Sequence, residues 1–236
     1  MAGHCDLSVI IPAYREAENL RLLLPRLRRA VDSLAIEHEV LVVDTPVPQD
    51  ETPQVCGDHG VRHIPRRGGD DYGDAIRTGL AEAAGEFIIF MDADGSHAPE
   101  FIPRLWDRVG EADVVVASRY VAGGGTENPT SLILMSRLLN FVYARVLGIP
   151  CRDVSNSFKL YRGDLIRSVP LRSRHFDIVE ELLIRAQGRK PSLRIIEIPF
   201  LFKKRLFGST KRNLPLFMLS FYTTLLKLFW IRMLGR

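Results

Sequence analysis

The chain has 236 residues, of which 46% are hydrophobic and 25% charged, and a formal net charge of +4. This length is ample for the core of one α/β domain, with or without a small appendage. Residues 1–8 are too short and too polar for a signal peptide, so we expect no export. Cys5, Cys56 and Cys151 lack any metal-ligand spacing, which favours free, non-catalytic thiols in a reducing compartment.

The charge is divided unevenly along the chain. Residues 198–236 contain eight basic residues and no acidic one, and the basic residues alternate with Leu, Phe, Trp and Met. Cations interleaved with apolar side chains fit an anionic membrane surface better than a nucleic acid. We therefore expect a membrane surface, and no nucleic acid, among the partners.

Strand and helix patterns alternate through the first half of the chain. Apolar runs predict strands over residues 7–11, 39–43, 61–64, 87–91 and 113–117. Apolar residues at helical spacing predict helices over residues 20–34, 75–83 and 101–109. This alternation predicts an α/β fold with a Rossmann-like, mostly parallel sheet flanked by helices. The first strand is not followed by G-x-G-x-x-G, which argues against a dinucleotide dehydrogenase.

Two carboxylates follow the most apolar predicted strand. Asp92-Ala93-Asp94 comes directly after residues 87–91 and before Gly95-Ser96-His97. Ligands of parallel sheets bind beyond the carboxyl ends of the strands, and residues i and i+2 of extended backbone project to the same side. Asp92 and Asp94 can therefore converge on a hard cation, Mg²⁺ or Mn²⁺, with a diphosphate as its partner. The alternative is a solvated acidic turn.

Several segments, in order, resemble family 2 glycosyltransferases of the GT-A fold, and among them dolichol-phosphate (polyprenol-phosphate) mannosyltransferases most. They begin with Leu7-Ser8-Val9-Ile10-Ile11-Pro12-Ala13-Tyr14-Arg15-Glu16 and Gly73-Asp74-Ala75-Ile76-Arg77-Thr78-Gly79-Leu80, and continue with Met91-Asp92-Ala93-Asp94-Gly95-Ser96-His97-Ala98-Pro99-Glu100, Ala117-Ser118-Arg119-Tyr120, Asp153-Val154-Ser155-Asn156-Ser157-Phe158-Lys159 and Pro199-Phe200…Arg205…Gly208-Ser209-Thr210-Lys211. The likeness covers roughly residues 6–212.

The resemblance implies a set of site residues. Metal ligands are expected at Asp92, Asp94 and Ser96, and catalytic residues at Asp94, Arg119, Arg205 and Lys211. The nucleotide sugar is expected to be bound by Pro12, Tyr14, Glu16, Asp44, Gly73, Asp92, Ala93, Asp94, Arg119, Arg205 and Lys211. Structural alternatives stay open: a first-turn helix residue for Glu16, a strand-ending turn for Asp44, and a surface arginine for Arg119.

Three further residues are weaker candidates. Arg67 lies in a Gly-containing loop that offers cations to phosphates. His97 is expected either to orient Asp94 or the metal as an outer ligand, or to serve as a helix-start residue with a backbone partner. Of the adjacent acids Glu180 and Glu181, only one can face inward, and Glu181 is the one expected near the donor.

The chain departs from the family pattern at three points. The loop after Asp44 lacks the usual second acid, and Ser96 stands where polyprenol-phosphate enzymes often have Gln. Leu132 and Ile133 occupy the place of a usual arginine, so the acceptor phosphate is expected to be held by Arg137, Arg119 or Lys211.

Together these features predict a metal-dependent, inverting glycosyltransferase on the cytoplasmic face of a membrane. It is expected to transfer a hexose from a nucleotide sugar, with mannose from GDP-mannose as the best guess, to a polyprenyl or dolichyl phosphate. Glucose from UDP-glucose is the alternative donor, and a non-catalytic, membrane-associated nucleotide-sugar-binding protein is the alternative class. A nucleotidyltransferase is disfavoured because no Gly-rich basic signature follows the first strand.

The C-terminal segment is expected to form its own unit. We predict a catalytic domain over residues 1–212 and an amphipathic membrane-interface helix over residues 213–236. The apolar run 214–226 has thirteen residues, too few to span a bilayer, and should lie in the interface or dock on a small membrane-protein partner. Expected headgroup contacts are Lys211, Arg212, Lys227 and Arg232, and expected inserted residues are Phe217, Phe221, Leu225, Leu226, Phe229 and Trp230. The alternative is a helix packed on the protein's own sheet.

Overall fold

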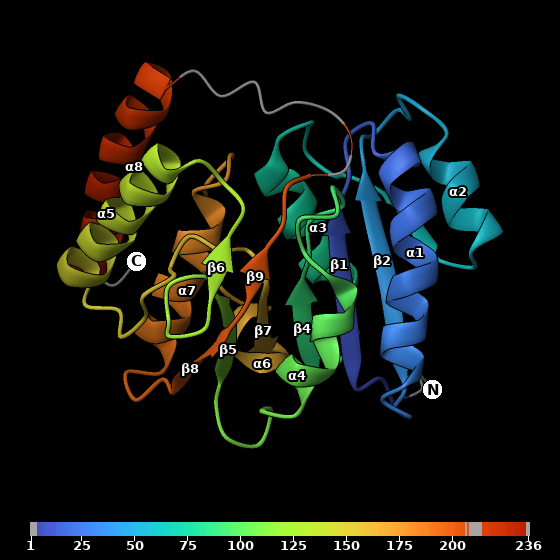
Figure 1. Cartoon of the computed structure of the whole chain (residues 1–236), viewed down its shortest axis with the longest axis horizontal. Coiled ribbons are helices and arrows are strands. Elements are labelled where there is room, and N and C mark those ends of the chain that lie inside the picture. Colours follow the sequence, from blue (N-terminus) through green and yellow to red (C-terminus); the bar gives the residue numbers. More distant parts are fainter. Residues whose placement is uncertain (1–3, 206, 208–213, 235–236) are drawn as a thin grey trace.

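A seven-stranded sheet forms the centre of the protein in the computed structural model, which describes residues 4–205, 207 and 214–234 (Figure 1). The strand order is β3-β2-β1-β4-β7-β5-β8, and every neighbouring pair is parallel except the two that involve β7. The strands are β1 (Leu7–Pro12), β2 (His38–Asp44), β3 (Arg62–Pro65), β4 (Phe87–Phe90), β5 (Val114–Ser118), β7 (Lys159–Arg162) and β8 (Ile195–Pro199). This confirms the predicted α/β class.

Helices cover both faces of the sheet (Figure 1). Alternate residues of each central strand enter different cores: Ile88 lies in the cluster with α3, α5, α7 and α8, and Ile89 lies in the cluster with α1, α2 and α4. The helices are α1 (Ala17–Asp32), α2 (Thr52–Asp58), α3 (Tyr72–Glu82), the 3₁₀ turn η1 (Pro99–Phe101), α4 (Ile102–Trp106), α5 (Thr130–Leu147), α6 (Gly163–Ile166), α7 (Ile178–Arg189) and α8 (Leu214–Leu234).

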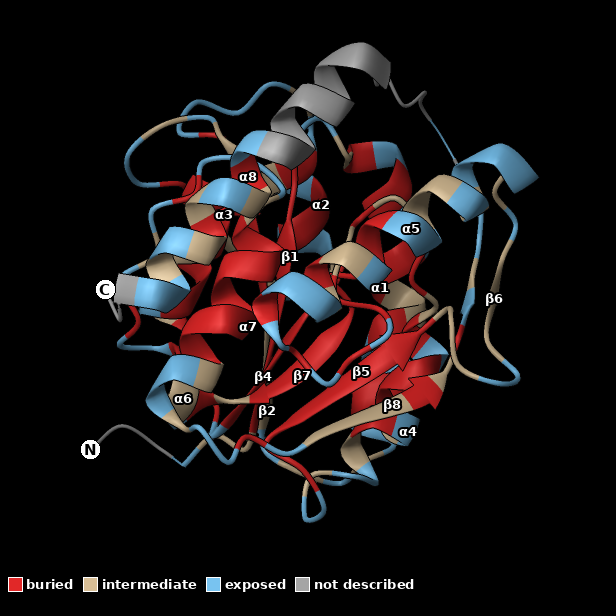
Figure 2. Cartoon of the chain, turned by 90° about the vertical axis from the view of Figure 1, so that its left-hand side faces the viewer, coloured by how far each residue is buried: buried red, intermediate tan, exposed pale blue. Residues whose placement is uncertain are grey.

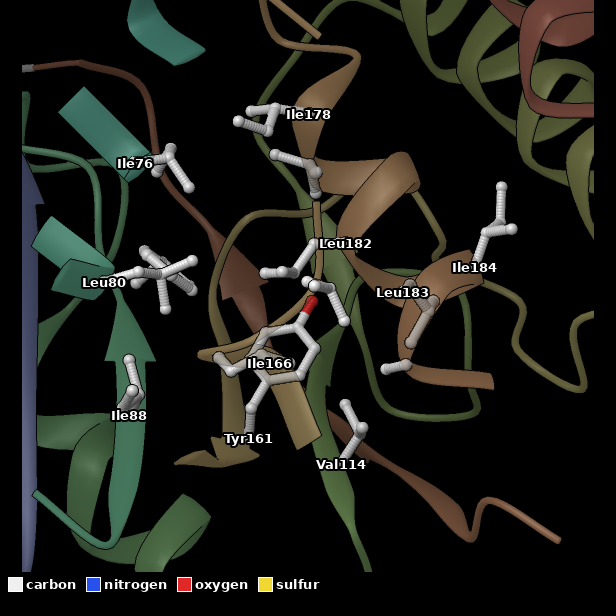
Figure 3. Packing of buried hydrophobic residues seen from close by; sticks show 14 of the residues in the cluster. Ile76, Leu80, Ile88, Val114, Tyr161, Ile166, Ile178, Leu182, Leu183 and Ile184 are labelled. Carbon is white, nitrogen blue, oxygen red and sulfur yellow. The ribbon is translucent and has the colours of Figure 1, made fainter. Parts of the chain in front are cut away.

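The first core cluster joins elements that are far apart in the sequence. Figure 3 shows Leu80 of α3, Ile88 of β4 and Leu182 of α7 pointing toward one another, with Tyr161 of β7 below them. All four side chains are at most 5% exposed. Burying each one contributes about 2 kcal/mol, so this cluster fixes α3 and α7 on the sheet.

Strand β7 was not predicted, and it changes the layout of the site. Its sequence, Lys-Leu-Tyr-Arg, has no apolar run, and it pairs antiparallel with both β4 and β5. A strand that runs against its neighbours begins at the edge where they end. The segment that precedes β7, residues 153–158, therefore lies at the same edge as the ends of β1, β2, β4 and β5, which we call the carboxyl edge.

The described part of α8 packs on the protein. Leu228 is fully buried, and Leu225 and Phe229 pack against the first core cluster. Lys227 donates to Ser173 Oγ at 2.8 Å and to Asp177 Oδ2 at 3.3 Å. The expectations that Lys227 reaches lipid headgroups and that Leu225 and Phe229 insert into lipid are therefore wrong, because these side chains face α7 and α5.

Other parts of the tail prediction remain open. Lys211 and Arg212, and the side chains of Phe217 and Phe221, lie outside the described residues. Leu226 and Trp230 are 43% and 59% exposed on the outer side of α8, as their predicted role requires. The division of the chain at residue 212 stays a prediction.

Candidate active site

Asp92 and Asp94 lie at the carboxyl edge, directly beyond the end of β4. Met91 still donates its N–H to Ile10 O at 3.0 Å, so the chain stays extended up to the first carboxylate. The backbone then turns at Gly95, whose φ of +81° lies in the left-handed region that favours glycine. The side chains of Asp92 and Asp94 are 26% and 17% exposed, which leaves both carboxylates accessible to a small ligand.

Asp92 is held by hydrogen bonds to neutral side chains from three separate segments. Its Oδ1 accepts hydrogen bonds from Tyr72 OH at 3.4 Å and from Ser157 Oγ at 3.2 Å, and its backbone N–H donates to His97 Nδ1 at 3.0 Å. Tyr72 begins α3, and Ser157 precedes β7. The sequence analysis missed both residues as supports of the carboxylate, because their proximity depends on the antiparallel placement of β7.

His97 is a positioning residue behind Asp92. It is fully buried, stacks on Phe158 at 4.8 Å between ring centroids, and places Nε2 3.2 Å from Asn156 Oδ1. Because Nδ1 accepts from Asp92 N–H, the proton must sit on Nε2, which donates to Asn156. Burial lowers the pKa of His97 and keeps the ring neutral. Both ring nitrogens are thus engaged, and the expected backbone partner is the amide of Asp92.

Asp94 has a different set of partners, one of which is a cation. Its Oδ1 accepts from Ser96 Oγ at 2.6 Å and from Ser96 N at 3.0 Å, and its Oδ2 accepts from Arg205 Nη2 at 2.9 Å. Burial alone would raise the pKa of Asp94, but these hydrogen bonds outweigh it and lower the pKa. Ser96 is 1% exposed and turned toward Asp94, so it supports a carboxylate here, and its role as a direct metal ligand stays a prediction.

Arg205 reaches Asp94 from the C-terminal part of the chain. Two short strands, β6 (Gly125–Thr126) and β9 (Leu201–Phe202), pair beside the main sheet (Figure 1). Lys203 then donates its N–H to Ser96 O at 3.2 Å, which carries the chain over the turn that holds both carboxylates. The structure therefore brings Arg205 and Asp94 together across 111 positions of sequence, as the predicted site requires.

Glu16 lies close to the two aspartates. Burial is the main cause that raises the pKa of Glu16, and the charges of Asp94 and Asp92 add to it. Its Oε2 accepts a hydrogen bond from Asn19, and the preceding Arg15 has a φ of +55°. Tyr14 is 51% exposed at the end of β1. The charge of Arg205 acts in the opposite direction to those of the two aspartates and lowers the pKa of Glu16.

Asp44 and Pro12 end neighbouring strands on the predicted nucleotide side. Asp44 is fully buried, and its carboxylate accepts from Thr45 N at 2.7 Å and lies 3.2 Å from His63 Nε2. Arg66, which the sequence analysis did not single out, is 6% exposed and donates to the carbonyl oxygens of Ala13 and Asp70. It therefore ties the end of β1 to the loop before α3.

Position 73 must be a glycine because the start of α3 lies very close to the backbone of residues 173–174. Its N–H donates to Arg174 O at 2.7 Å, and a Cβ at this position would lie 2.2 Å from Ser173 O. Glu181 holds that loop from the other side, since its carboxylate accepts from Arg172 N at 3.0 Å and from Ser173 N at 2.7 Å. Glu181 thus supports the start of α3 instead of facing the donor, which is a correction to the expected role.

Arg119 is oriented by a buried carboxylate that was not assigned from the sequence. Its Nε and Nη2 donate to the two oxygens of Asp153 at 2.8 and 2.6 Å, and Nη2 also donates to Ser155 Oγ at 3.0 Å. Arg119 and Arg137 both lie over the ring of Tyr120, 5.0 and 5.5 Å from its centroid. Two guanidinium groups therefore lie near the same aromatic ring at the carboxyl edge.

Two predicted phosphate ligands are not brought to this place by the described structure. Arg67 is an exposed residue that pairs with Glu82 on α3. Lys211 lies outside the described residues. Within the described ranges there is no group of three or more His, Cys, Asp or Glu side chains arranged to hold a metal. Asp92 and Asp94 offer two hard oxygen ligands, which fits Mg²⁺ or Mn²⁺ only if a ligand such as a diphosphate, or water, completes the shell.

Two helices beside the site expose apolar side chains. The α5–α8 face consists of Leu134, Leu138 and Phe141 of α5 and Leu226, Trp230 and Met233 of α8, each at least 43% exposed. Figure 2 shows the two helices on the same side of the molecule, with exposed residues toward the viewer. Among the described residues, α5 alone is long and apolar enough to cross a membrane by length and composition, and 22% of it is buried.

Helix α5 is connected to the site by a buried amide. Asn140 is 1% exposed, accepts from Ser155 N at 2.9 Å and donates to Ser155 Oγ at 3.0 Å. Ser155 Oγ in turn accepts from Arg119. Helix α5 and Arg119 are therefore joined through Asn140 and Ser155 by hydrogen bonds.

The structure thus places a carboxylate pair, with an arginine on one carboxylate, at the carboxyl edge of the sheet, where ligands of parallel sheets bind. The chain belongs to Glycosyl transferase family 2, whose profile matches residues 8–169, and it is a glycosyltransferase. It is 35% identical to the undecaprenyl-phosphate mannosyltransferase of Micrococcus luteus over 86% of each chain. It is 33% identical to the dolichol-phosphate mannosyltransferase of Pyrococcus furiosus over 87% of this chain and 58% of that protein.

Solved structures agree on the fold. The glucosyl-3-phosphoglycerate synthase of Mycobacterium tuberculosis, in complex with Mn²⁺, UDP and glucosyl-3-phosphoglycerate, matches with a TM-score of 0.71 over 95% of this chain and 80% of that one. The same enzyme with Mg²⁺ and UDP matches with a TM-score of 0.70. At 20% and 21% identity these likenesses concern the fold alone, and they confirm the GT-A architecture.

Proposed function

We propose that this protein transfers mannose from GDP-mannose to the phosphate of a polyprenyl or dolichyl phosphate at the cytoplasmic face of a membrane. The observation that carries the proposal is the placement of Asp92 and the Asp94–Arg205 pair at the carboxyl edge. The choice of substrates is supported by the relatives named as undecaprenyl-phosphate and dolichol-phosphate mannosyltransferases. The cytoplasmic side is supported by three free cysteines.

The two carboxylates would hold Mg²⁺ or Mn²⁺ together with the donor diphosphate. When bound, the metal neutralises negative charge that develops on the departing nucleoside diphosphate. Asp92 is suited to this role because Tyr72, Ser157 and His97 fix its orientation. Arg205 neutralises Asp94 and stands where its guanidinium can also donate to a donor phosphate.

The nucleotide would lie against the ends of β1 and β2. Pro12, Tyr14 and Glu16 leave β1 at the carboxyl edge, and Gly73 allows the start of α3 to come close to the loop at Ser173. The buried carboxylate of Asp44 is the candidate acceptor for a hydroxyl or amino group of the nucleotide, although Thr45 and His63 already contact it. The altered loop after Asp44 makes the identity of the base the least constrained part of the proposal.

The acceptor phosphate would approach from the side of Arg119 and Arg137. A phosphate is already anionic, so its oxygen can attack the anomeric carbon without a strong general base. In-line attack opposite the leaving diphosphate inverts the configuration of that carbon. The cost of bringing two anions together is lowered by guanidinium groups at the carboxyl edge, which can bind phosphate through paired hydrogen bonds.

The lipid chain of the acceptor would lie along the α5–α8 face. Neither α5 nor α8 contains an acidic residue, and α5 carries the exposed Arg137 and Arg145. Exposed apolar side chains flanked by cations suit the surface of an anionic membrane. Asn140 joins this face to Ser155 and Arg119, so membrane contact and acceptor phosphate binding would be geometrically linked.

The proposal is tested by transfer of label into lipid. The full chain is incubated with liposomes that contain undecaprenyl phosphate or dolichyl phosphate, and with radiolabelled GDP-mannose or UDP-glucose, in the presence of Mg²⁺, Mn²⁺ or EDTA. We expect label from GDP-mannose in the lipid phase only with a metal, and none with the Asp94→Asn variant. Label from UDP-glucose alone would overturn the donor assignment. Binding of a donor without transfer to either lipid would overturn the proposed reaction.

A further inference from the structure

A cavity of about 520 Å³ lies between the last turn of α7 and the end of α8. Its size is within the range of cavities that bind small molecules. The loops that close it contribute residues just after α6 and just after α7. It is lined by Val169, Pro170, Ile184, Arg185, Gln187, Gly188, Arg189, Pro191, Ile231 and Arg232.

This cavity is separate from the candidate active site. Helix α7 begins at Ile178, which lines a small pocket together with Tyr72, and Tyr72 contacts Asp92. The cavity is at the other end of the same helix, around Arg189. With a rise of 1.5 Å per residue, the two ends of α7 are about 17 Å apart. A molecule in the cavity would therefore not occupy the site of sugar transfer.

The charged part of the lining is entirely basic. Arg185, Arg189 and Arg232 line the cavity, and no acidic residue of the described chain does. The side chain of Arg185 is 6% exposed; its Nε donates to Glu181 Oε1 at 2.8 Å, and its Nη2 is buried with no acceptor among the described residues. A buried guanidinium N–H without an acceptor costs free energy, and Arg185 is also one of the residues that line the cavity.

The other two arginines approach from opposite sides. Arg189 of α7 donates to Ser168 Oγ, beside the loop that follows α6. Arg232 of α8 lies over Gly148, where a Cβ would collide with its guanidinium. An anion between them would bind α7 and α8 at the same time. Three guanidinium groups from two helices are a typical setting for a phosphate, which accepts paired hydrogen bonds from each.

The remaining walls are apolar. Val169, Pro170, Ile184, Pro191 and Ile231 supply them. The next residues of α8 on either side, Trp230 and Met233, are 59% and 64% exposed and belong to the α5–α8 face. The cavity thus combines a cationic wall with an apolar one, close to the surface that we assign to the membrane. An inorganic ion would leave the apolar wall without a partner.

We propose that this cavity binds the phosphate group of an anionic phospholipid, with Arg185, Arg189 and Arg232 around the phosphate and the apolar wall against the start of the acyl chains. A phospholipid bound there contacts both α7 and the end of α8, and so stabilises the orientation of α8 relative to α7. The site is additional to the one for the acceptor lipid. It rests on the proposed membrane face, but its test does not depend on sugar transfer.

The test is a calorimetric titration of the full chain with dihexanoyl phosphatidic acid below its micelle concentration. Inorganic phosphate and dihexanoyl phosphatidylcholine are titrated in parallel, and the variants are Arg189→Gln, Arg232→Gln, Arg137→Gln and the control Arg29→Gln. Arg29 is an exposed arginine on α1, on the opposite face of the sheet. Arg137→Gln separates binding in the cavity from binding of the same lipid at the proposed acceptor site.

We expect phosphatidic acid to bind, and each cavity variant to weaken that binding about tenfold, the usual effect of losing one charged hydrogen bond. Arg137→Gln and Arg29→Gln should leave the cavity component unchanged. Equal binding of inorganic phosphate and phosphatidic acid would overturn the lipid part of the proposal. Equal binding of phosphatidylcholine, or no effect of Arg189→Gln and Arg232→Gln, would overturn the phosphate site itself. These results stand whether or not mannose transfer is observed.

Discussion

The two sides of the candidate active site are built in different ways. On the donor side, Asp44 and Arg66 are buried and already have protein partners, so the ends of β1 and β2 form a fixed polar frame. On the acceptor side, Arg137 is exposed and the neighbouring α5–α8 face is apolar and open. A nucleotide presents the same polar groups at every turnover and suits a preformed frame, whereas a long lipid needs an open apolar surface. The predictions below test this division.

The largest effect should follow from loss of either carboxylate between the two sides. Asp92→Asn or Asp94→Asn should reduce mannose transfer about a thousandfold, because several kcal/mol of transition-state stabilisation depend on the metal that they would hold. Transfer into lipid and circular dichroism measure activity and folding separately. Asp107→Asn, at an exposed position after α4, is the control. Nearly full activity of both site variants, with no inhibition by EDTA, would disprove the metal-dependent mechanism.

Of the two arginines over Tyr120, Arg119 should contribute to both folding stability and transfer, and Arg137 to transfer alone. Arg119→Ala leaves the fully buried Asp153 without its guanidinium partner, which should cost about 3 kcal/mol of folding free energy and lower the melting temperature by roughly 6–12 °C. Transfer should fall as well. Arg137→Ala should reduce transfer about tenfold, the effect of one charged hydrogen bond to phosphate, with no change in melting temperature. Equal melting temperatures of the two variants would contradict the division.

His97 offers a test of the fixed support behind Asp92. His97→Phe retains an aromatic ring on Phe158 but removes the acceptor for Asp92 N–H. We expect the Mn²⁺ concentration for half-maximal activity to rise 10- to 100-fold, as for other groups that orient metal ligands. His97→Asn, which keeps a side-chain acceptor, should recover part of the loss. An unchanged metal requirement in both variants would assign His97 to packing alone.

The open side is tested by polar substitution on α5. Leu138→Gln and Phe141→Gln should each lower the affinity for anionic liposomes about tenfold. Each substitution removes on the order of 1.4 kcal/mol of apolar transfer free energy, and this free energy corresponds to a tenfold change in affinity. Nucleotide binding should not change. Leu22→Gln, at a leucine that is 49% exposed on α1, is the matched control. A similar loss with Leu22→Gln, or none with the α5 variants, would place the membrane contact elsewhere.

The sequence predicted the donor side better than the acceptor side. Strands β1, β2 and β4 are continuous apolar runs, and the residues after them can be placed at one edge from the rule for parallel sheets. The Asp94–Arg205 contact was within reach of the family resemblance. Asp153 and Ser157 belong to a segment that carries the resemblance, but their contacts with Arg119 and Asp92 were not predicted. Those contacts depend on β7, a strand of four residues that has no periodic signal and runs antiparallel.

For the C-terminal helix, composition did not predict which residues contact the protein. Residues 198–236 contain no acidic residue and are rich in basic and apolar ones, so composition cannot tell which side of α8 faces the protein. Contacts decide it: Lys227 pairs with Asp177, and Leu228 is buried. Likewise, two adjacent acids on α7 could not be assigned from spacing, and the structure gives the backbone-bonded role to Glu181.

A pH-dependent effect on stability is expected from these two acids, which are adjacent in the sequence of α7 and should respond to pH in opposite directions. Burial raises the pKa of Glu180 to about 7, and its Oε2 has no hydrogen-bond partner among the described residues. Burial also acts on Glu181, but hydrogen bonds from Ser173 and Arg185 outweigh it and lower that pKa. A raised carboxyl pKa means that Glu180 binds its proton more tightly in the folded state, so its ionisation destabilises the fold as the pH rises toward 7.

Glu180→Gln should therefore raise the melting temperature at pH 8 by several degrees and have almost no effect near pH 4.5. A pKa raised from 4.5 to about 7 corresponds to roughly 3 kcal/mol of folding free energy, which sets the upper limit of the effect. Glu181→Gln should do the opposite: it should lower the melting temperature at pH 8, and its effect should fade as the pH falls below the ordinary carboxyl range, where the wild-type group is protonated too. Thermal unfolding of both variants between pH 2.5 and pH 8 measures this. Parallel pH profiles would mean that the two carboxylates share one environment. They would contradict the conclusion that Glu181 alone supports the loop beside the start of α3.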